Sequence, residues 1–138
     1  MQTIVLSAAR AAVNGALKIM STPLPHTLHY WNNTNDTITW NCEIPQPGKY
    51  LIKLNYSLDK HLTGGIVQIA IGEQSITFET STTDSWLHFR EVDAGVISIE
   101  QTGRLSVELK GVKLPVANDS AFPDIHTVSL VLTDCVTE

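Results

Sequence analysis

The sequence is short of charged residues and of long apolar runs, and each shortage excludes a class of protein. Charged residues make up only 17% of the 138 residues while 43% are hydrophobic, so the chain is not an intrinsically disordered tail. No apolar run approaches the roughly 18 residues that a membrane span needs. Residues 1–6 also lack the basic segment that opens a secretion signal. We therefore expect a globular protein with no membrane partner.

Basic residues are scarce as well. The chain has 9 Lys and Arg against 14 Asp and Glu, a formal net charge of −5. Because a surface that binds nucleic acid must be basic to attract phosphates, this balance argues against a nucleic acid as the partner. No linker, charge block or internal repeat divides the chain, and its length suits one core. We expect a single domain over residues 1–138.

Cysteine is nearly absent, with only Cys42 and Cys135 in the chain. There is no CxxC pair and no Cys/His cluster, so we expect neither a zinc site nor another metal cofactor. Cys42 lies in an alternating apolar stretch and is predicted to pack as a small reduced hydrophobe. A disulfide between the two cysteines stays open, because sequence spacing does not decide it.

Motifs of catalysis are also missing. The chain contains no Gly-x-Ser-x-Gly, no His-Glu-x-x-His, no phosphate loop and no Gly-x-Gly-x-x-Gly. Asp59 and His61 could form an acid–base pair, but such pairs occur on any protein surface. The sequence therefore predicts a protein that is not an enzyme and needs no cofactor.

Alternation of apolar and polar residues is what the sequence has in abundance. Side chains on a strand point to opposite faces in turn, so each alternating row predicts a half-buried strand. We predict strands in eight such rows, 37–44, 50–58, 67–71, 76–78, 87–89, 97–99, 105–109 and 128–132, with shorter candidates at 3–6 and 16–20. The predicted fold is all-β, an antiparallel jelly-roll β-sandwich of about nine strands.

Two segments depart from this alternation. Residues 7–14 read as one short helical turn that Gly15 would cap at its C-terminus. Residues 111–124 contain two prolines and read as a long loop, which is where a rigid sandwich tends to carry a binding site.

An ordered series of short motifs resembles a known group of modules. The series is Ile4-Val5-Leu6-Ser7-Ala8-Ala9, Tyr30-Trp31, Asp36-Thr37-Ile38-Thr39-Trp40, Pro47-Gly48-Lys49-Tyr50-Leu51-Ile52, Gly64-Gly65-Ile66-Val67, Thr83-Asp84-Ser85-Trp86, Gly95-Val96-Ile97-Ser98-Ile99 and Ser129-Leu130-Val131-Leu132. It resembles the galactose-binding-like jelly rolls of carbohydrate-binding module families 6 and 35 and of fucosidase-type glycosidases. The resemblance implies a non-catalytic carbohydrate-binding module, an accessory domain of a glycan-degrading protein. Such a module would be extracytoplasmic where the parent glycosidase is secreted.

The chain departs from those families at two positions. Where they carry a glutamate that helps to hold calcium, this chain has Ser7 to Ala11, with the cation Arg10 and no carboxylate. Calcium needs several oxygen ligands, so we expect no calcium at that position. The asparagine that the families place before the last strand is also missing, and Asp124 stands nearby. These departures support an alternative, a structural or protein-interaction sandwich that has lost the sugar site.

Five residues are predicted to contact the sugar. Leu87 and Phe89 would set the buried face of a strand, which places Trp86, His88 and Arg90 together on its polar face. Indole stacks on the C–H face of a sugar ring while polar side chains contact its hydroxyls. The resemblance adds a second stacking aromatic, Tyr30, and Asp124 is predicted to contact hydroxyls. Neither a particular sugar nor an oligomeric state follows from the sequence.

Structural roles compete with each of these interpretations. Trp86 could cap the edge of the sandwich, and Trp31 could anchor the core while Tyr30 decorates an edge. Trp40 shares its parity with Ile38 and is predicted to be core. The run Asn32 to Asp36 could bind a cation, but Asn and Asp are also common turn formers, and we predict a turn. His126 shares its parity with apolar neighbours and is predicted to pack at the start of a strand.

Overall fold

The computed structural model describes residues 3–20, 26–117 and 120–135, with the backbone alone at 134 and 135. This part of the chain forms strands and one short helix. The elements are β1 (Thr3–Ser7), η1 (Ala8–Arg10), β2 (Ala12–Asn14), β3 (Lys18–Met20), β4 (Thr27–His29), β5 (Thr37–Ile44), β6 (Gly48–Ser57), β7 (Ile66–Ile71), β8 (Gln74–Glu79), β9 (Arg90–Ile99), β10 (Gly103–Lys113) and β11 (Asp124–Cys135).

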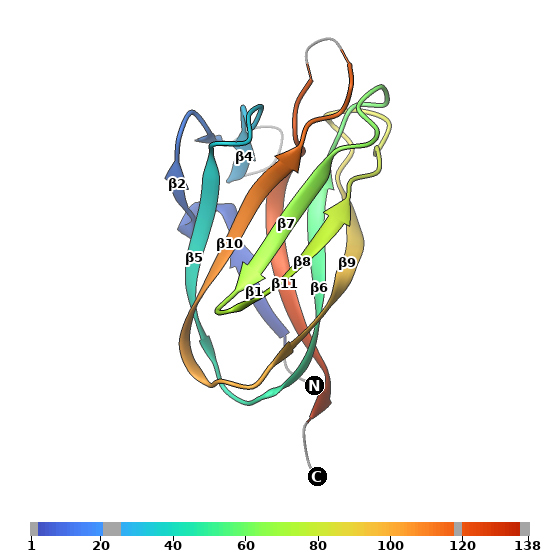
Figure 1. The fold of residues 1–138 in the computed structure, drawn as a ribbon. Coiled ribbons are helices and arrows are strands. Elements are labelled where there is room, and N and C mark those ends of the chain that lie inside the picture. Colours follow the sequence, from blue (N-terminus) through green and yellow to red (C-terminus); the bar gives the residue numbers. More distant parts are fainter. Residues whose placement is uncertain (1–2, 21–25, 118–119, 136–138) are drawn as a thin grey trace.

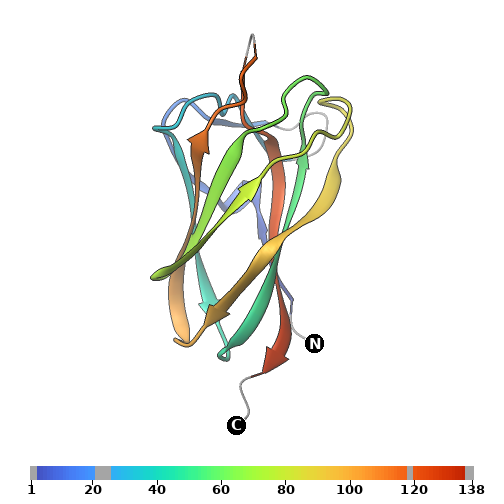
Figure 2. The same ribbon diagram turned by 45° about the vertical axis from the view of Figure 1, so that its right-hand side comes forward.

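The strands form two antiparallel sheets that pack face to face (Figure 1). One sheet has the order β3-β4-β11-β6-β9, and β1 also pairs with β11 in it. The other has the order β2-β5-β10-β7-β8. The strands of both sheets run along one long axis, as Figure 2 shows from another side. The predicted antiparallel jelly-roll sandwich is confirmed.

The core lies between the sheets and follows the alternation in the sequence. In β5, Ile38, Trp40, Cys42 and Ile44 are buried, while Asn41 and Glu43 between them are exposed. Trp40 is core as predicted, and its indole Nε1 donates a hydrogen bond to the Ser7 carbonyl at 2.8 Å. Full burial of an apolar side chain contributes about 1.5–3 kcal/mol, so these inward rows are what stabilises the sandwich.

Cys42 is a buried, free thiol. Burial, and secondarily the charge of Glu43, raises the pKa of this thiol. The disulfide that the sequence left open is therefore not formed at Cys42, and the side chain of Cys135 lies outside the described residues.

The predicted helical turn over 7–14 is largely wrong. β1 extends to Ser7, a three-residue 3-10 helix covers Ala8–Arg10, and Ala12–Asn14 form β2. β2 pairs with β5, and this pairing prevails over the local helical preference. Gly15 does not cap a helix. It has φ +125, and a Cβ there would overlap the Asp36 carboxylate, whose Oδ2 accepts a hydrogen bond from the Ala16 amide at 3.0 Å.

The predicted strand at 87–89 is also wrong. This segment belongs to a turn, Leu87 is 76% exposed, and β9 begins only at Arg90. Ser85 holds the turn, because its Oγ accepts from the Leu87 amide at 2.9 Å and its carbonyl accepts from the His88 amide at 3.2 Å. Three alternating residues are too few to separate a strand from a turn.

Two boundaries near the C-terminus differ from expectation. β10 continues to Lys113, so the long connection is shorter at its start than the predicted 111–124, and Asn118 and Asp119 in it lie outside the described residues. In β11 the pairing with β6 shifts between Ile125 and Thr127. Because of this bulge, Ile125 and Val128 are both buried, and His126 does not share the parity of Val128.

The two ends of the sandwich carry connections of different length. We call the end with the connections 30–36, 58–65, 80–89 and 114–123 the loop end, and the end with the connections 45–47, 72–73 and 100–102 the hairpin end. β1 begins and β11 ends toward the hairpin end (Figure 1). Among the described residues, no helix has the length and hydrophobicity needed to cross a membrane.

Candidate functional site

A cavity of about 300 Å³ opens at the loop end. Three segments that are far apart in sequence form it: the end of β4 with the residues after it, the 80–89 connection, and the residues just before and at the start of β11 (Figure 1). Its lining residues are His29, Tyr30, Trp31, Asn32, Trp86, Leu87, Ala121, Phe122 and Asp124. The cavity is thus lined mostly by aromatic and apolar side chains.

Trp31 and Phe122 form the buried base of the cavity. Their ring centroids lie 4.8 Å apart at an interplanar angle of 36°, and the Phe122 amide donates to the Trp31 carbonyl at 2.7 Å. Gly111 of β10 makes room for this pair, because a Cβ at that position would overlap the Phe122 ring. Trp31 Nε1 is buried and has no hydrogen-bond partner among the described residues. As the structural alternative proposed, Trp31 is core and Tyr30 is exposed.

The 80–89 connection carries Trp86 and is held in place by three side chains. The Tyr56 hydroxyl donates to the Ser81 carbonyl at 2.8 Å. Thr83 is fully buried, and its Oγ1 accepts from the Leu58 amide at 2.9 Å. Arg90 Nη2 donates to the Thr82 carbonyl at 2.8 Å. Trp86, half-buried and packed against the core, is therefore presented by a loop with fixed ends.

Tyr30 lies at the mouth of the cavity in an unusual backbone conformation. Its φ is 65, in the left-handed region that non-glycine residues rarely adopt, and its side chain is 56% exposed. Such strained residues occur preferentially at binding and catalytic sites.

Asp124, the first residue of β11, is the one acid among the described residues that line the cavity. Its Oδ2 lies 3.1 Å from His29 Nδ1, and His29 Nε2 lies 2.7 Å from the Thr27 hydroxyl. Burial raises the pKa of Asp124 to about 7, so the carboxyl is protonated in part of the molecules near neutrality. The Asp124 side chain is 10% exposed and lines the cavity, where a ligand hydroxyl can reach it.

The structure brings together three of the five predicted site residues. Tyr30, Trp86 and Asp124 all line the cavity. His88 is exposed and Arg90 anchors the loop through Thr82, so neither lines it. The sequence predicts both beside Trp86 on the polar face of a strand at 87–89, and the structure has no strand at those residues.

Sequence reasoning missed His29, Leu87 and Phe122 as lining residues. His29 meets Asp124 only because β4 pairs with β11, and no local signal reports that pairing. Phe122 lies in the 111–124 segment that the sequence predicts as a long loop suited to binding, and it is two residues from Asp124, so both signals could have indicated it.

The run Asn32 to Asp36 is a turn, as predicted. Asn33 Oδ1 accepts from the amides of Asn35 and Asp36, both at 2.9 Å. Across the described chain, no group of three or more His, Cys, Asp or Glu side chains is arranged to hold a metal ion. Asp59 Oδ2 and His61 Nδ1 do form a pair at 3.4 Å, but this pair does not line the cavity.

Comparison with solved structures places the fold among carbohydrate-binding modules. A family 35 module from Clostridium thermocellum has TM-score 0.75 and 16% identity, with 96% of this chain and 100% of that chain covered. The C-terminal family 6 module of a laminarinase from Zobellia galactanivorans has TM-score 0.75 and 15% identity, with 94% and 99% covered. A family 35 module from Cellvibrio japonicus has TM-score 0.72 and 17% identity, with 97% and 99% covered. At these identities the similarity establishes a shared fold.

Comparison of the sequence with curated proteins and with family models gives a match to a family model. No curated protein matches the chain. The family model described as "Domain of unknown function (DUF5077)" matches residues 22–134. Since this match covers most of the chain, the protein belongs to the DUF5077 family.

Proposed function

We propose that the protein is a non-catalytic carbohydrate-binding module that holds a sugar ring in the cavity at the loop end. The observation that carries this proposal is the cavity itself, which combines aromatic walls with one buried carboxyl. A fold shared with modules of families 6 and 35 supports it.

The cavity has the two kinds of surface that a pyranose needs. The Trp86 and Tyr30 rings offer apolar faces for the C–H side of the sugar. The Asp124 carboxyl accepts a hydrogen bond from a sugar hydroxyl, and His29 Nδ1 lies 3.1 Å from its Oδ2. Among the described lining residues there is no Lys or Arg, so this position favours a sugar without an acidic group.

The same lining argues against hydrolysis at this position. Glycosidases of the common kind need two carboxyl groups on either side of the scissile bond. Here Asp124 is the one carboxyl among the described lining residues, and no second one faces it. Binding without catalysis is therefore the activity that the site supports.

A role as an accessory domain agrees with one further similarity. A mannanase from Podospora anserina, described as GH26-CBM35, covers 98% of this chain, while the match spans only 28% of the enzyme. In this protein the segments that line the cavity lie at the end away from the start of β1 and the end of β11 (Figure 1). A neighbouring domain joined at either terminus would leave the cavity accessible, and in a secreted enzyme the module would act outside the cytoplasm.

The test is binding of laminari-, manno- and galacto-oligosaccharides by isothermal titration calorimetry and affinity electrophoresis. At least one series is expected to bind, and Trp86→Ala should weaken that binding by about 10-fold or more, a loss of about 1.4 kcal/mol. His88→Ala is the matched control, because His88 is exposed on the same loop and does not line the cavity. A folded protein that retains none of these sugars would contradict the proposal.

One observation favours a second candidate, a protein-interaction sandwich. Leu87 is 76% and Val116 is 95% exposed, both on connections at the loop end, and a contiguous exposed apolar patch marks a protein interface. A stable oligomer in light scattering that Leu87→Asp dissociates, together with no sugar binding, would favour this candidate over the first.

A further inference from the structure

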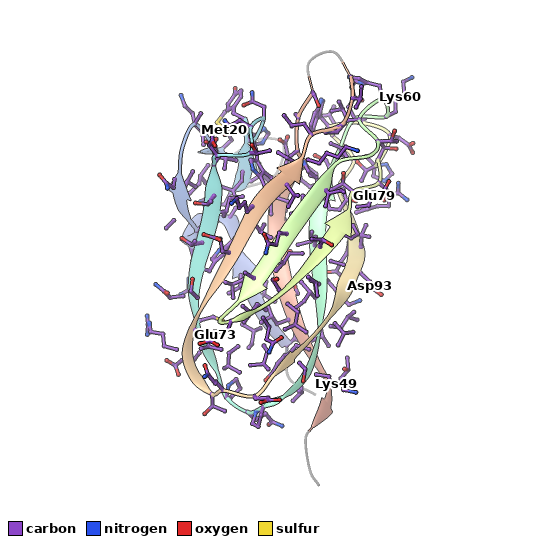
Figure 3. All side chains as sticks on the ribbon, viewed as in Figure 1. Met20, Lys49, Lys60, Glu73, Glu79 and Asp93 are labelled. Carbon is purple, nitrogen blue, oxygen red and sulfur yellow. The ribbon has the colours of Figure 1, made fainter. Side chains whose placement is uncertain are left out.

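A second depression adjoins the cavity on the far side of Tyr30. It has a volume of about 380 Å³ and is lined by Ala16, Lys18, Met20 and Tyr30. Tyr30 therefore contributes to both hollows. Figure 3 shows Met20 near β4 at the loop end, on the same end of the sandwich as the cavity.

The pairing of β3 with β4 ties the two hollows together. Lys18 on β3 is the register partner of His29 on β4, and His29 lines the first cavity. Residues in register on neighbouring strands lie side by side on one face of the sheet. Asp124, His29, Tyr30 and Lys18 therefore belong to one continuous surface at the loop end.

The backbone of Tyr30 supports a role for its ring in both hollows. With φ 65 the residue sits in a conformation that disfavours bulky side chains, and yet the ring is 56% exposed instead of packed in the core. Burial of the Tyr30 ring therefore does not explain why the conformation is kept. Contact of the ring with a ligand would explain it.

We propose that Tyr30 separates two adjacent sugar subsites, so that the ligand is an oligosaccharide of at least two units. This inference rests on the proposed function, and it adds where the second unit binds. In the first subsite, Asp124 accepts a hydrogen bond from a sugar hydroxyl. In the second subsite, Ala16, Met20 and the Tyr30 ring form an apolar floor, and Lys18 donates a hydrogen bond to an oxygen of the sugar.

The opposite polarity of the subsites gives the ligand a direction. Among the described lining residues, the first subsite has a carboxyl and no Lys or Arg, whereas the second has Lys18 and no carboxyl. A unit rich in free hydroxyl donors suits the first subsite, and a unit that presents oxygen acceptors suits the second.

Affinity as a function of chain length tests this directly. The probes are laminari-, manno- and galacto-oligosaccharides of one to four units, measured by titration calorimetry with the intact protein. In the series that binds, the disaccharide should bind at least about 10-fold more tightly than the monosaccharide, with little further gain beyond three units. Lys18→Ala should reduce the disaccharide affinity about fivefold or more and leave the monosaccharide affinity unchanged.

Lys49→Ala is the matched control, because Lys49 is an exposed lysine at the opposite end of the sandwich (Figure 3). Equal affinity for one unit and for longer chains, with Trp86→Ala still weakening the binding, would overturn the second subsite and keep the proposed function. An equal loss for all chain lengths in Lys18→Ala would overturn it as well. No binding of any probe would contradict both proposals.

Discussion

The two ends of the sandwich differ in both geometry and chemistry. At the hairpin end, the connections are two or three residues long: 72–73 joins the paired strands β7 and β8, while 45–47 and 100–102 cross from one sheet to the other. A hollow of about 150 Å³ there is lined by Glu73, Gln74, Glu100 and Gln101 among others. At the loop end, four aromatic residues line the cavity, Tyr30, Trp31, Trp86 and Phe122.

The difference shows what a loop needs in order to present a binding surface. A two-residue hairpin turn offers too few side chains to form a lining at the end of the sandwich. The longer connections at the loop end are instead tied to the core by hydrogen bonds from Tyr56, Thr83 and Arg90 and by the buried Phe122 ring. Long loops with such anchors can hold aromatic side chains in place for a ligand.

The largest expected effect comes from removing the base of the cavity. Phe122→Ala deletes a fully buried ring that packs 4.8 Å from Trp31, and we expect it to lower the free energy of unfolding by about 3–5 kcal/mol. Sugar binding should be lost with it. Val116→Ala, 95% exposed in the same connection, should change stability by less than about 0.5 kcal/mol. Urea unfolding measures both, and equal stability of the two variants would show that the ring does not support the loop end.

The next effect is pH-dependent and arises at Asp124. Burial raises the pKa of this carboxyl from 3.8 to about 7 in the folded protein. The folded state therefore holds the proton more tightly, and the stability that Asp124 contributes is complete below about pH 4 and lost as the pH rises to about 7. Asp124→Asn stays neutral at every pH, so the variant should gain stability relative to the parent over this range.

The gain has an upper limit of about 4 kcal/mol, since one pKa unit corresponds to about 1.4 kcal/mol. A protonated His29, 3.1 Å from the carboxyl, stabilises the charged form and reduces the gain. Urea unfolding of parent and variant at pH 4, 5, 6, 7 and 8 measures it. Asp59→Asn, in the more exposed pair with His61, is the control. A stability difference that stays constant with pH would mean that burial does not perturb Asp124.

A smaller effect is expected from the loop anchor. Arg90→Gln removes the 2.8 Å hydrogen bond to the Thr82 carbonyl, which lies in the connection that carries Trp86. Affinity for the sugar should fall about threefold, less than 1 kcal/mol, because Trp86 itself is retained. Arg104→Gln, whose side chain is 71% exposed and 3.8 Å from Glu43, removes the same charge away from the cavity. Equal affinities of the two variants would exclude a positioning role for Arg90.

The smallest effect is expected from calcium. The described residues offer no group of three acidic, histidine or cysteine side chains for a metal, and Glu73 and Glu100 at the hairpin end make only a pair. Calcium requires six to eight oxygen ligands. Melting temperatures in millimolar calcium and in chelator should therefore agree within about one degree. A rise of many degrees that chelator abolishes would contradict the expectation that no calcium binds at the Ser7 to Ala11 segment.

Much of the fold follows from the sequence, because burial on one side of a strand imposes a period of two. The strand predicted at 37–44 agrees with β5 at both ends, and the rows near 50–58, 67–71 and 105–109 coincide with β6, β7 and β10. The pattern failed where rows were short, as at 87–89, or where a bulge shifted the parity, as at His126. In both places pairing or hydrogen bonding outside the window decided the structure.

The candidate site was also predictable from the sequence only in part. The sequence named Tyr30, Trp86 and Asp124 on other grounds: the family resemblance indicated Tyr30, and Trp86 was predicted on the polar face of a strand over 87–89, which the structure does not have. Their meeting in one cavity was decided by tertiary structure alone: β4 pairs with β11, Gly111 leaves space for Phe122, and Thr83 holds the Trp86 loop. These contacts join segments that lie tens of residues apart, and local periodicity carries no information about which segments meet.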